Sequence, residues 1–419
     1  MTTTETDSRR LKLGTRGSRL ALTQSGQVAE ALMAAGGGGA AAAAGKASEG
    51  SGGLGIDLVT VRTDGDGDRT PLRQLGGVGV FAARLRHALL DGEVDLVVHS
   101  FKDLPTQPVE GLEVICVPAR EDPRDALCAR DGLTLADLPE GARVGTGSPR
   151  RAAQLLAARP DLEVVDLRGN VPTRLARVRG LEAVGVGTDE PVAPSRADAA
   201  GDLDAVVLAL SGLRRLGLEH CASEVLDLET MLPAPAQGAL AVEARAGEDC
   251  PELARAVAAL DDEPTRLAVT AERALMARLG AGCAAPVGAW AHLRGGGQEQ
   301  REEHAEHGTG WNEGFRGDDT AATRTSQGAG VAEPRGSAVS RRSPRVLVLR
   351  AVVTSLDGGQ EVGCELSTEL PETSGGPRTP RDTAAVRAAE ALGVRAAEVL
   401  LDDGADQIVD LHANKPRRD

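Results

Sequence analysis

The sequence has almost no aromatic residues, with three Phe, two Trp and no Tyr among 419 residues. Its core must therefore be built from Ala, Val and Leu. Proteins that bind single-stranded nucleic acid stack the bases on aromatic side chains along a basic surface. This chain has 47 basic and 62 acidic residues, which leaves a net charge of −15. We therefore expect no nucleic-acid partner.

Long apolar runs and paired cysteines are also missing. No apolar stretch approaches the roughly 18 residues that a membrane span needs, and residues 1–10 lack the apolar region of a signal peptide. We therefore expect a cytoplasmic protein without a membrane partner. The six cysteines include no C-x-x-C pair, so neither a disulfide framework nor a zinc site is indicated, and we expect no metal.

Three stretches look like insertions: 36–53, 181–201 and 295–345. They are rich in Gly, Ala, Ser or charged residues and bury too little apolar surface to offset the entropy of ordering, which predicts mobile surface loops. Between them, short apolar strands alternate with helical patterns, which indicates α/β layers. The last part, with strands expected at 346–353 and 361–366 and a helix at 382–401, indicates a separate small α+β domain.

The other expected elements have clear start and stop signals. Strands are expected at 11–13, 94–98, 142–145, 163–167 and 205–210, and helices at 19–34, 149–158, 172–178, from 212 onward, and at 264–279. Ser148 before Pro149 is typical of an N-cap followed by proline at the first helical position. Pro172 and Ser211 mark their helices in the same way, and Gly280 is a plausible C-cap.

Basic and hydroxyl side chains gather at five expected strand-to-helix junctions. They are Arg16 and Ser18; His99, Ser100, Lys102 and Asp103; Thr146, Ser148, Arg150 and Arg151; Arg168, Asn170 and Arg174; and Ser211, Arg214 and Arg215. Strand ends line the ligand crevice of open α/β sheets, and helix N-termini and arginine side chains bind anions there. Together they predict one positive cleft for a polyanion or a molecule with several carboxylates. For any single arginine, a solvated position or an ordinary ion pair is the better interpretation.

Two further residues suggest chemistry. Asp103 is the one acid among these bases, where a carboxylate can stabilise a developing positive charge or shuttle a proton. Pairing with Lys102 or capping a turn explains Asp103 equally well. Cys283 follows Gly282 just after the helix at 264–279, where an exposed thiol would be a nucleophile or an attachment point. A small buried residue is the plainer interpretation of Cys283.

The sequence resembles the porphobilinogen deaminases, or hydroxymethylbilane synthases, of tetrapyrrole biosynthesis. Seven collinear motifs carry the resemblance: 15–18, 99–105, 121–126, 145–151, 167–171, 235–239 and 282–283. The resemblance runs from about Leu11 to His292 and resumes at Val346. The complete set is highly specific, whereas any one motif alone is weak.

The resemblance implies an enzyme that joins four porphobilinogens head to tail, releases ammonia each time, and finally frees hydroxymethylbilane by hydrolysis. The chain grows on a dipyrromethane cofactor held by a thioether, and Cys283 matches the cofactor cysteine. Asp103 matches the catalytic aspartate, which would stabilise an azafulvene-like cation and assist proton transfer. Further matches to cofactor-binding residues are Lys102, Ser18, Thr146, Ser148, Arg150, Arg151, Arg168 and Arg174. Matches to substrate-binding residues are Arg16, Arg168, Arg174 and Arg215.

The resemblance also implies the architecture. We expect two doubly wound α/β domains like those of periplasmic binding proteins, flanking a cleft, and a small C-terminal α+β domain. The expected limits are 1–118 with 239–257, then 120–232, then 258–419 with 295–345 as a flexible insertion. We expect a monomer. The sequence departs from the family at Gln74 and Val78, where many relatives have lysines, and at Ala281, where a second Gly is common.

A non-catalytic, two-lobed anion-binding protein is the alternative function. Cys283 and Asp103 discriminate between the two, since a pure binder needs neither residue. Nucleotide-dependent transfer would need a complete phosphate loop and metal-binding carboxylates, and the sequence offers neither.

Overall fold

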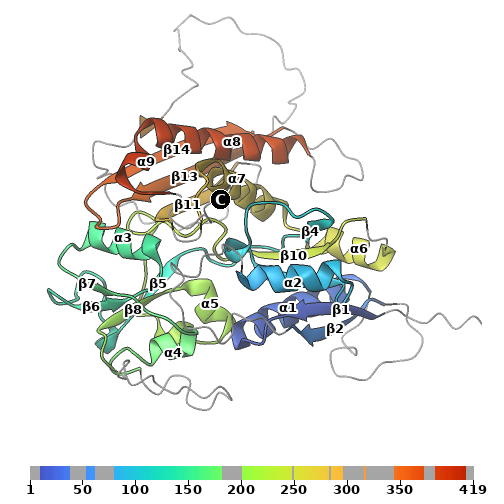
Figure 1. The fold of residues 1–419 in the computed structure, drawn as a ribbon, viewed down its shortest axis with the longest axis horizontal. Coiled ribbons are helices and arrows are strands. Elements are labelled where there is room, and N and C mark those ends of the chain that lie inside the picture. Colours follow the sequence, from blue (N-terminus) through green and yellow to red (C-terminus); the bar gives the residue numbers. More distant parts are fainter. Residues whose placement is uncertain are drawn as a thin grey trace, which may run out of the picture.

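The computed structural model describes residues 10–37, 53–61, 80–181, 201–247, 250–282, 285–295, 316–317, 344–371 and 383–411. They form three sheets with helices packed against them, two in neighbouring lobes and one in a C-terminal part (Figure 1). The expected α/β class, with two doubly wound lobes and an added α+β domain, is confirmed.

The first lobe has a five-stranded sheet in the order β2-β1-β3-β10-β4. Its strands are β1 (Arg10–Thr15), β2 (Gly55–Thr60), β3 (Leu96–Ser100), β4 (Leu112–Cys116) and β10 (Leu240–Arg245). β1 pairs in parallel with β2 and β3, whereas β10 runs antiparallel between β3 and β4. Helices α1 (Arg19–Ala35) and α6 (Pro251–Leu260) share one apolar core with this sheet, and α2 (Val80–Leu90) contributes to another.

The second lobe repeats this arrangement, with the order β7-β6-β8-β5-β9. Its strands are β5 (Asp125–Ala129), β6 (Arg143–Gly145), β7 (Glu163–Val165), β8 (Ala205–Ala209) and β9 (Glu224–Val225). Helix α3 (Pro149–Ala158) shares one core with the sheet, while α4 (Val171–Leu175) and α5 (Leu210–Arg215) share another. The chain crosses between the lobes twice. The first strand that it forms after each crossing, β5 or β10, is the fourth in the order of its sheet.

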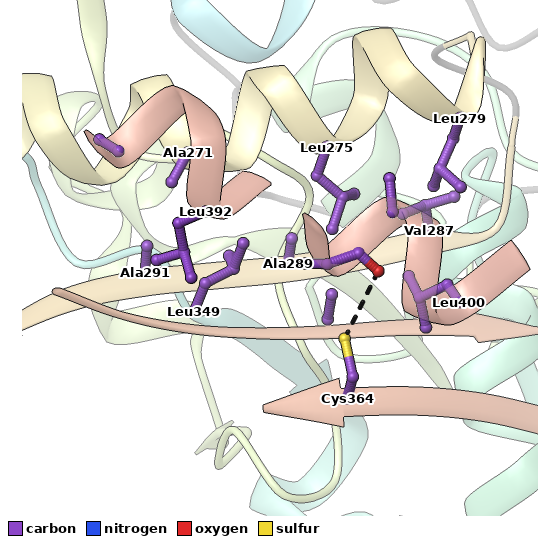
Figure 2. Close-up of a cluster of buried hydrophobic side chains, with 14 of the residues drawn as sticks. Ala271, Leu275, Leu279, Val287, Ala289, Ala291, Leu349, Cys364, Leu392 and Leu400 are labelled. Atoms are coloured by element: carbon purple, nitrogen blue, oxygen red, sulfur yellow. Dashed lines mark hydrogen bonds between the residues drawn. The ribbon is translucent and has the colours of Figure 1, made fainter. Parts of the chain in front are cut away.

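The C-terminal sheet has the order β11-β13-β14-β12. Its elements are β11 (Val287–Arg294), β12 (Arg316–Gly317), β13 (Val346–Thr354), β14 (Glu361–Glu369), α7 (Glu263–Leu279), α8 (Ala384–Asp402) and α9 (Ala405–Ile408). Leucine, alanine and valine from α7, α8, β11 and β13 fill its core, with Cys364 among them (Figure 2). A Cβ atom on Gly393 of α8 would lie 2.1 Å from the Ala271 carbonyl oxygen, so glycine permits the close packing of α7 and α8.

The expected aromatic-poor core is confirmed in the described part of the chain. The clusters of buried apolar side chains consist almost entirely of Leu, Val and Ala. Phe101 is the one aromatic side chain that the structure describes as buried.

The helix ends confirm some sequence signals and correct others. The Ser18 and Ser148 side chains accept hydrogen bonds from the first turns of α1 and α3, and Gly280 ends α7 in the left-handed conformation with φ of 63°. The prediction for Ser211 is wrong, because α5 begins at Leu210 and Ser211 lies buried inside it. α4 begins before Pro172, because the Asn170 side chain accepts from the Thr173 amide and caps it.

The expected insertions lie mostly outside the described residues, as do Gln74 and Val78. One part of 295–345 departs from the loop that we expected, because β12 pairs in parallel with β14 and adds an edge strand to the C-terminal sheet. Among the described helices, none combines the length and the apolar character needed to cross a membrane.

Candidate functional site

A buried ion-pair cluster lies where the second lobe begins. The Asp125 side chain, at the start of β5, is fully buried, and its Oδ2 atom lies 2.7 Å from Arg150 Nη2. Its Oδ1 atom lies 2.8 Å from Arg151 Nη2. Burial favours a higher pKa for Asp125, but the two guanidinium groups outweigh it and hold that pKa well below its usual range. Arg150 and Arg151 are therefore buried ion-pair partners, as the plainer interpretation allowed, and not solvated.

Lys102 brings the first lobe to this cluster. It lies in the short 3-10 helix η3 (Phe101–Asp103) after β3, and its Nζ donates to Gln237 Oε1 at 3.1 Å. Gln237 Nε2 in turn donates to Asp125 Oδ1 at 2.8 Å. Burial lowers the pKa of Lys102 to about 8, with Asp103 and Asp125 opposing the shift and Arg151 and Arg150 adding to it. The Asp103 side chain is exposed at the end of η3.

More cations lie on the second-lobe side of the cluster. Arg174 in α4 donates from Nε to the Gly169 carbonyl at 2.7 Å. Burial, Arg151 and Arg168 together lower the pKa of Arg174 to about 10, and Asp166 opposes them. Cations that depress one another's pKa are placed to receive anions, because a bound carboxylate would relieve their repulsion.

Hydroxyl groups shape the loop that leads into α3. Thr146 is buried, and its Oγ1 accepts from the Ser148 amide at 3.2 Å. Ser148 Oγ accepts from the Arg151 amide at 3.5 Å. These contacts fix the first turn of α3, from which Arg150 and Arg151 reach Asp125.

Arg16, Ser18 and Arg215 lie outside this buried cluster. Arg16 and Ser18 lie between β1 and α1, and Ser18 Oγ accepts from the Ala21 amide at 3.3 Å. Arg215 donates to the Gly238 carbonyl at 2.7 Å. It lines a cavity of about 300 Å³ together with residues of α1 and residues 118–121, where the chain first crosses between the lobes. Burial lowers the pKa of Arg215. Arg214 pairs with Glu121 at 2.8 Å.

Cys283 lies outside the described residues. The chain is described up to Gly282 and again from Ala285, whose amide donates to the Gly282 carbonyl at 3.0 Å. Five other cysteines are free thiols, and of these only Cys250 is not buried. In the described ranges, no three His, Cys, Asp or Glu side chains are grouped so that they could hold a metal ion.

Asp125 and Gln237 are site residues that the sequence interpretation missed. Both lie in motifs that carried the family resemblance, but neither was given a role. Their side chains meet although they are 112 residues apart in sequence. The amide of Gln237 inside an otherwise apolar motif segment was the available signal, since buried polar groups need partners, whereas Asp125 lies among other charged residues.

Comparisons with known proteins agree with the geometry. Residues 11–251 match the model of the porphobilinogen deaminase, dipyromethane cofactor binding domain, and residues 266–299 match that of the porphobilinogen deaminase C-terminal domain. The porphobilinogen deaminase of Cutibacterium acnes is 46% identical over 409 residues, covering 97% of this chain and 99% of the relative. That of Micrococcus luteus is 47% identical over 409 residues, covering 94% of this chain and 93% of the relative.

A solved structure gives a weaker likeness. A YaeC-family lipoprotein from Enterococcus faecalis is 16% identical, with a TM-score of 0.31, covering 60% of this chain and 91% of the lipoprotein. This likeness is too distant to bear on function. The family model covers more than half of the chain, and the two relatives match nearly all of it. This chain therefore belongs to the porphobilinogen deaminase family.

Proposed function

We propose that this chain is a hydroxymethylbilane synthase, a transferase that joins four porphobilinogens head to tail and releases ammonia at each step. The observation that carries the proposal is a cluster of cations that lies beside the exposed carboxylate of Asp103. The cations are Lys102, Arg150, Arg151, Arg168 and Arg174. Each porphobilinogen brings an acetate and a propionate, so a growing chain accumulates the anions that such a cluster binds.

The chemistry of these donors fits a dipyrromethane cofactor. Burial and neighbouring arginines lower the pKa values of Lys102 and Arg174, and ligand carboxylates would compensate their charge. Within the described residues, Arg150 Nε is buried without a hydrogen-bond partner. We propose that Lys102, Arg150, Arg151, Arg168 and Arg174 hold the cofactor carboxylates. Cys283 anchors the cofactor through a thioether. When bound, the dipyrromethane supplies the pyrrole carbon at which chain growth begins.

The protein's own groups then have separate tasks. Arg16 and Arg215, together with Arg168 and Arg174, bind the carboxylates of the incoming porphobilinogen. The Asp103 carboxylate stabilises the positive charge that develops as the substrate C–N bond breaks and ammonia leaves. It then accepts the proton displaced from the pyrrole carbon as the new C–C bond forms. Ser18, Thr146 and Ser148 support this arrangement by fixing the starts of α1 and α3.

We further propose three domains: 1–118 with 239–257, 120–232, and 258–419. The pairing of β10 with β3 and β4 supports the split first domain, although α6 continues to Leu260. We propose a monomer in the cytoplasm. Free thiols in the described part of the chain suit a reducing compartment.

Intact mass tests the proposed function. We expect the purified wild type to exceed its sequence mass by two linked pyrrole units, and Cys283→Ala to match its sequence mass. Cys250→Ala is the matched control and should keep the adduct. Cys250 is chosen because, among the cysteines that the structure describes, it is the one that is not buried. An adduct on Cys283→Ala would overturn the attachment site. A wild type that stays at its sequence mass and consumes no porphobilinogen would overturn the function.

Cofactor loading should depend on the charge of Lys102. The rate at which cofactor-free protein gains the adduct from porphobilinogen is expected to fall as the pH rises through about 8. The reason is that burial lowers the Lys102 pKa to about 8, so its positive charge is lost there. Mass spectrometry of timed samples measures this rate. Lys102→Met should load slowly and lack this decline, whereas Lys12→Met, at an exposed position in β1, should retain it. A decline unchanged in Lys102→Met would contradict the assignment.

A further inference from the structure

The Gln237 side-chain amide joins the two lobes at the site. It is fully buried, and its Oε1 atom lies 3.1 Å from Lys102 Nζ of the first lobe. The same oxygen lies 3.5 Å from Arg151 Nη2 of the second lobe. At the other end, Nε2 donates to Asp125 Oδ1 at 2.8 Å and to the Pro123 carbonyl at 2.7 Å. One amide thus accepts from two cations and donates to two acceptors.

The backbone at Gln237 is held by the C-terminal part of the molecule. Ala236 has a φ of 62°, a left-handed conformation that a non-glycine residue adopts only when its surroundings enforce it. The Ala236 amide donates to Glu272 Oε2 of α7 at 2.5 Å. Arg120 pairs with the same buried carboxylate at 2.6 Å and donates to the Gln237 carbonyl at 2.8 Å. These contacts therefore fix the backbone from which the Gln237 side chain extends.

No other side chain of this size offers the same set of contacts. A glutamate would accept from Lys102 and Arg151 but would place an anion against the Asp125 carboxylate. A methionine would fill the volume but would leave Lys102 Nζ without this acceptor. A buried donor or acceptor without its partner is costly, so we expect replacement of the amide to change this spacing.

We propose that Gln237 is a positioning residue, which fixes Lys102 Nζ relative to the Arg150–Arg151–Asp125 cluster across the boundary between the lobes. This inference rests on the proposed function, because it makes the spacing of cations from the two lobes depend on one amide. In the proposed reaction, that spacing sets how the ligand carboxylates are held. A displacement of about 1 Å at such a site can reduce the rate about 10²-fold.

The first test does not require activity. The pKa of Lys102 is measured from the pH dependence of its labelling by acetic anhydride, read by peptide mass mapping. In Gln237→Glu the new anion should raise this pKa, and in Gln237→Met loss of the acceptor should lower it. The charged groups that already act on Lys102 are Asp103, Asp125, Arg150 and Arg151, and both variants retain all of them. An unchanged pKa in both variants would overturn the contact, whether or not the wild type consumes porphobilinogen.

The second test measures kcat/KM of the cofactor-loaded enzyme between pH 6 and 8. For Gln237→Glu we expect a loss of about 10²-fold at pH 8. Acidification should restore activity, because burial and the Asp125 carboxylate favour protonation of the new carboxyl group against the effect of Lys102 and Arg151, and the protonated group can donate again. A merely structural defect would lower kcat/KM by the same factor at every pH. If Gln237→Glu does not fold, Gln237→Met takes its place and should be impaired at every pH in this range. Wild-type kcat/KM in both variants would overturn the positioning role.

Gln154→Glu is the matched control. Gln154 is also buried and uses both ends of its amide, donating to the Leu232 carbonyl at 3.1 Å and accepting from the Leu232 amide at 2.7 Å. This substitution adds an acid at a comparable buried position, beside Arg150 rather than Lys102, because Arg150 Nη1 donates to the same Leu232 carbonyl at 2.6 Å. It should lower stability but leave the Lys102 pKa and the pH dependence of kcat/KM unchanged. The same pH dependence in Gln154→Glu as in Gln237→Glu would contradict the inference.

Discussion

Replacing Asp103 by asparagine is expected to reduce the turnover of porphobilinogen about 10²–10⁴-fold while leaving the covalent adduct in place. Asp103 is exposed at the end of η3, beside Lys102 and the arginine cluster. An amide there can neither stabilise the positive charge that develops as ammonia leaves nor accept the proton displaced from the pyrrole carbon. Release of ammonia measures turnover, and intact mass reports the adduct.

Two further variants separate this chemistry from local damage. Glu110→Gln removes another exposed carboxylate from the segment that follows η3 and should leave turnover unchanged. Asp103→Glu keeps the charge on a longer side chain and should retain part of the activity. Near-normal ammonia release by Asp103→Asn would remove Asp103 from the mechanism, and loss of the adduct would show that it acts in assembly instead.

Asp125→Asn should be the most destabilising of these substitutions. It leaves the Arg150 and Arg151 guanidinium groups buried without their counter-charge, although the side chain keeps nearly the same shape. Removing one partner from a buried ion pair costs about 3–5 kcal/mol of folding free energy. The midpoint of urea unfolding, compared with that of the wild type, measures this loss.

The control for Asp125→Asn is an exposed ion pair in the first lobe. Asp57 pairs with Arg10 at 2.6 Å, but both side chains are 51% exposed to solvent. Asp57→Asn should therefore change the folding free energy by only about 0–1 kcal/mol. Equal shifts in the two midpoints would show that the Asp125 cluster does not stabilise the second lobe more than a surface pair does.

The stabilisation by Asp125 also has a defined pH range. Its pKa in the folded protein is held below the ordinary value, so the unfolded chain takes up a proton first as the pH falls. The contribution of Asp125 is therefore complete above about pH 4, the ordinary range of an aspartate. It is lost as the pH falls from there through the folded-state pKa.

Local signals in the sequence predicted the elements better than the contacts of the site. Ser148 and Pro149 predicted the start of α3, and Gly280 the end of α7, because capping depends on residues within one turn. The prediction for Ser211 was wrong because it also relied on a local signal alone. A serine favours a cap, but the apolar face of α5 buries Leu210 and Leu213 and determines where the helix begins.

The connections within the site depend on distant pairs, which no local pattern encodes. Lys102 and Gln237 meet across 135 residues, and Gln237 and Asp125 across 112. The junction pattern identified Arg150, Arg151 and Lys102 as candidates. It did not show that a buried carboxylate and an amide hold them together, because that follows only from how the two lobes are joined. The position of Cys283 in the fold stays a prediction.

The interleaved strand order has a consequence for biosynthesis on the ribosome. β10, at 240–245, lies between β3 and β4, so the first sheet is incomplete until the second lobe has been synthesised. All strands of the second sheet lie within 125–225. The N-terminal half of a nascent chain usually folds first. Here the lobe that emerges later is the first that can complete its sheet. β4 has no partner strand until β10, more than a hundred residues downstream, has been synthesised.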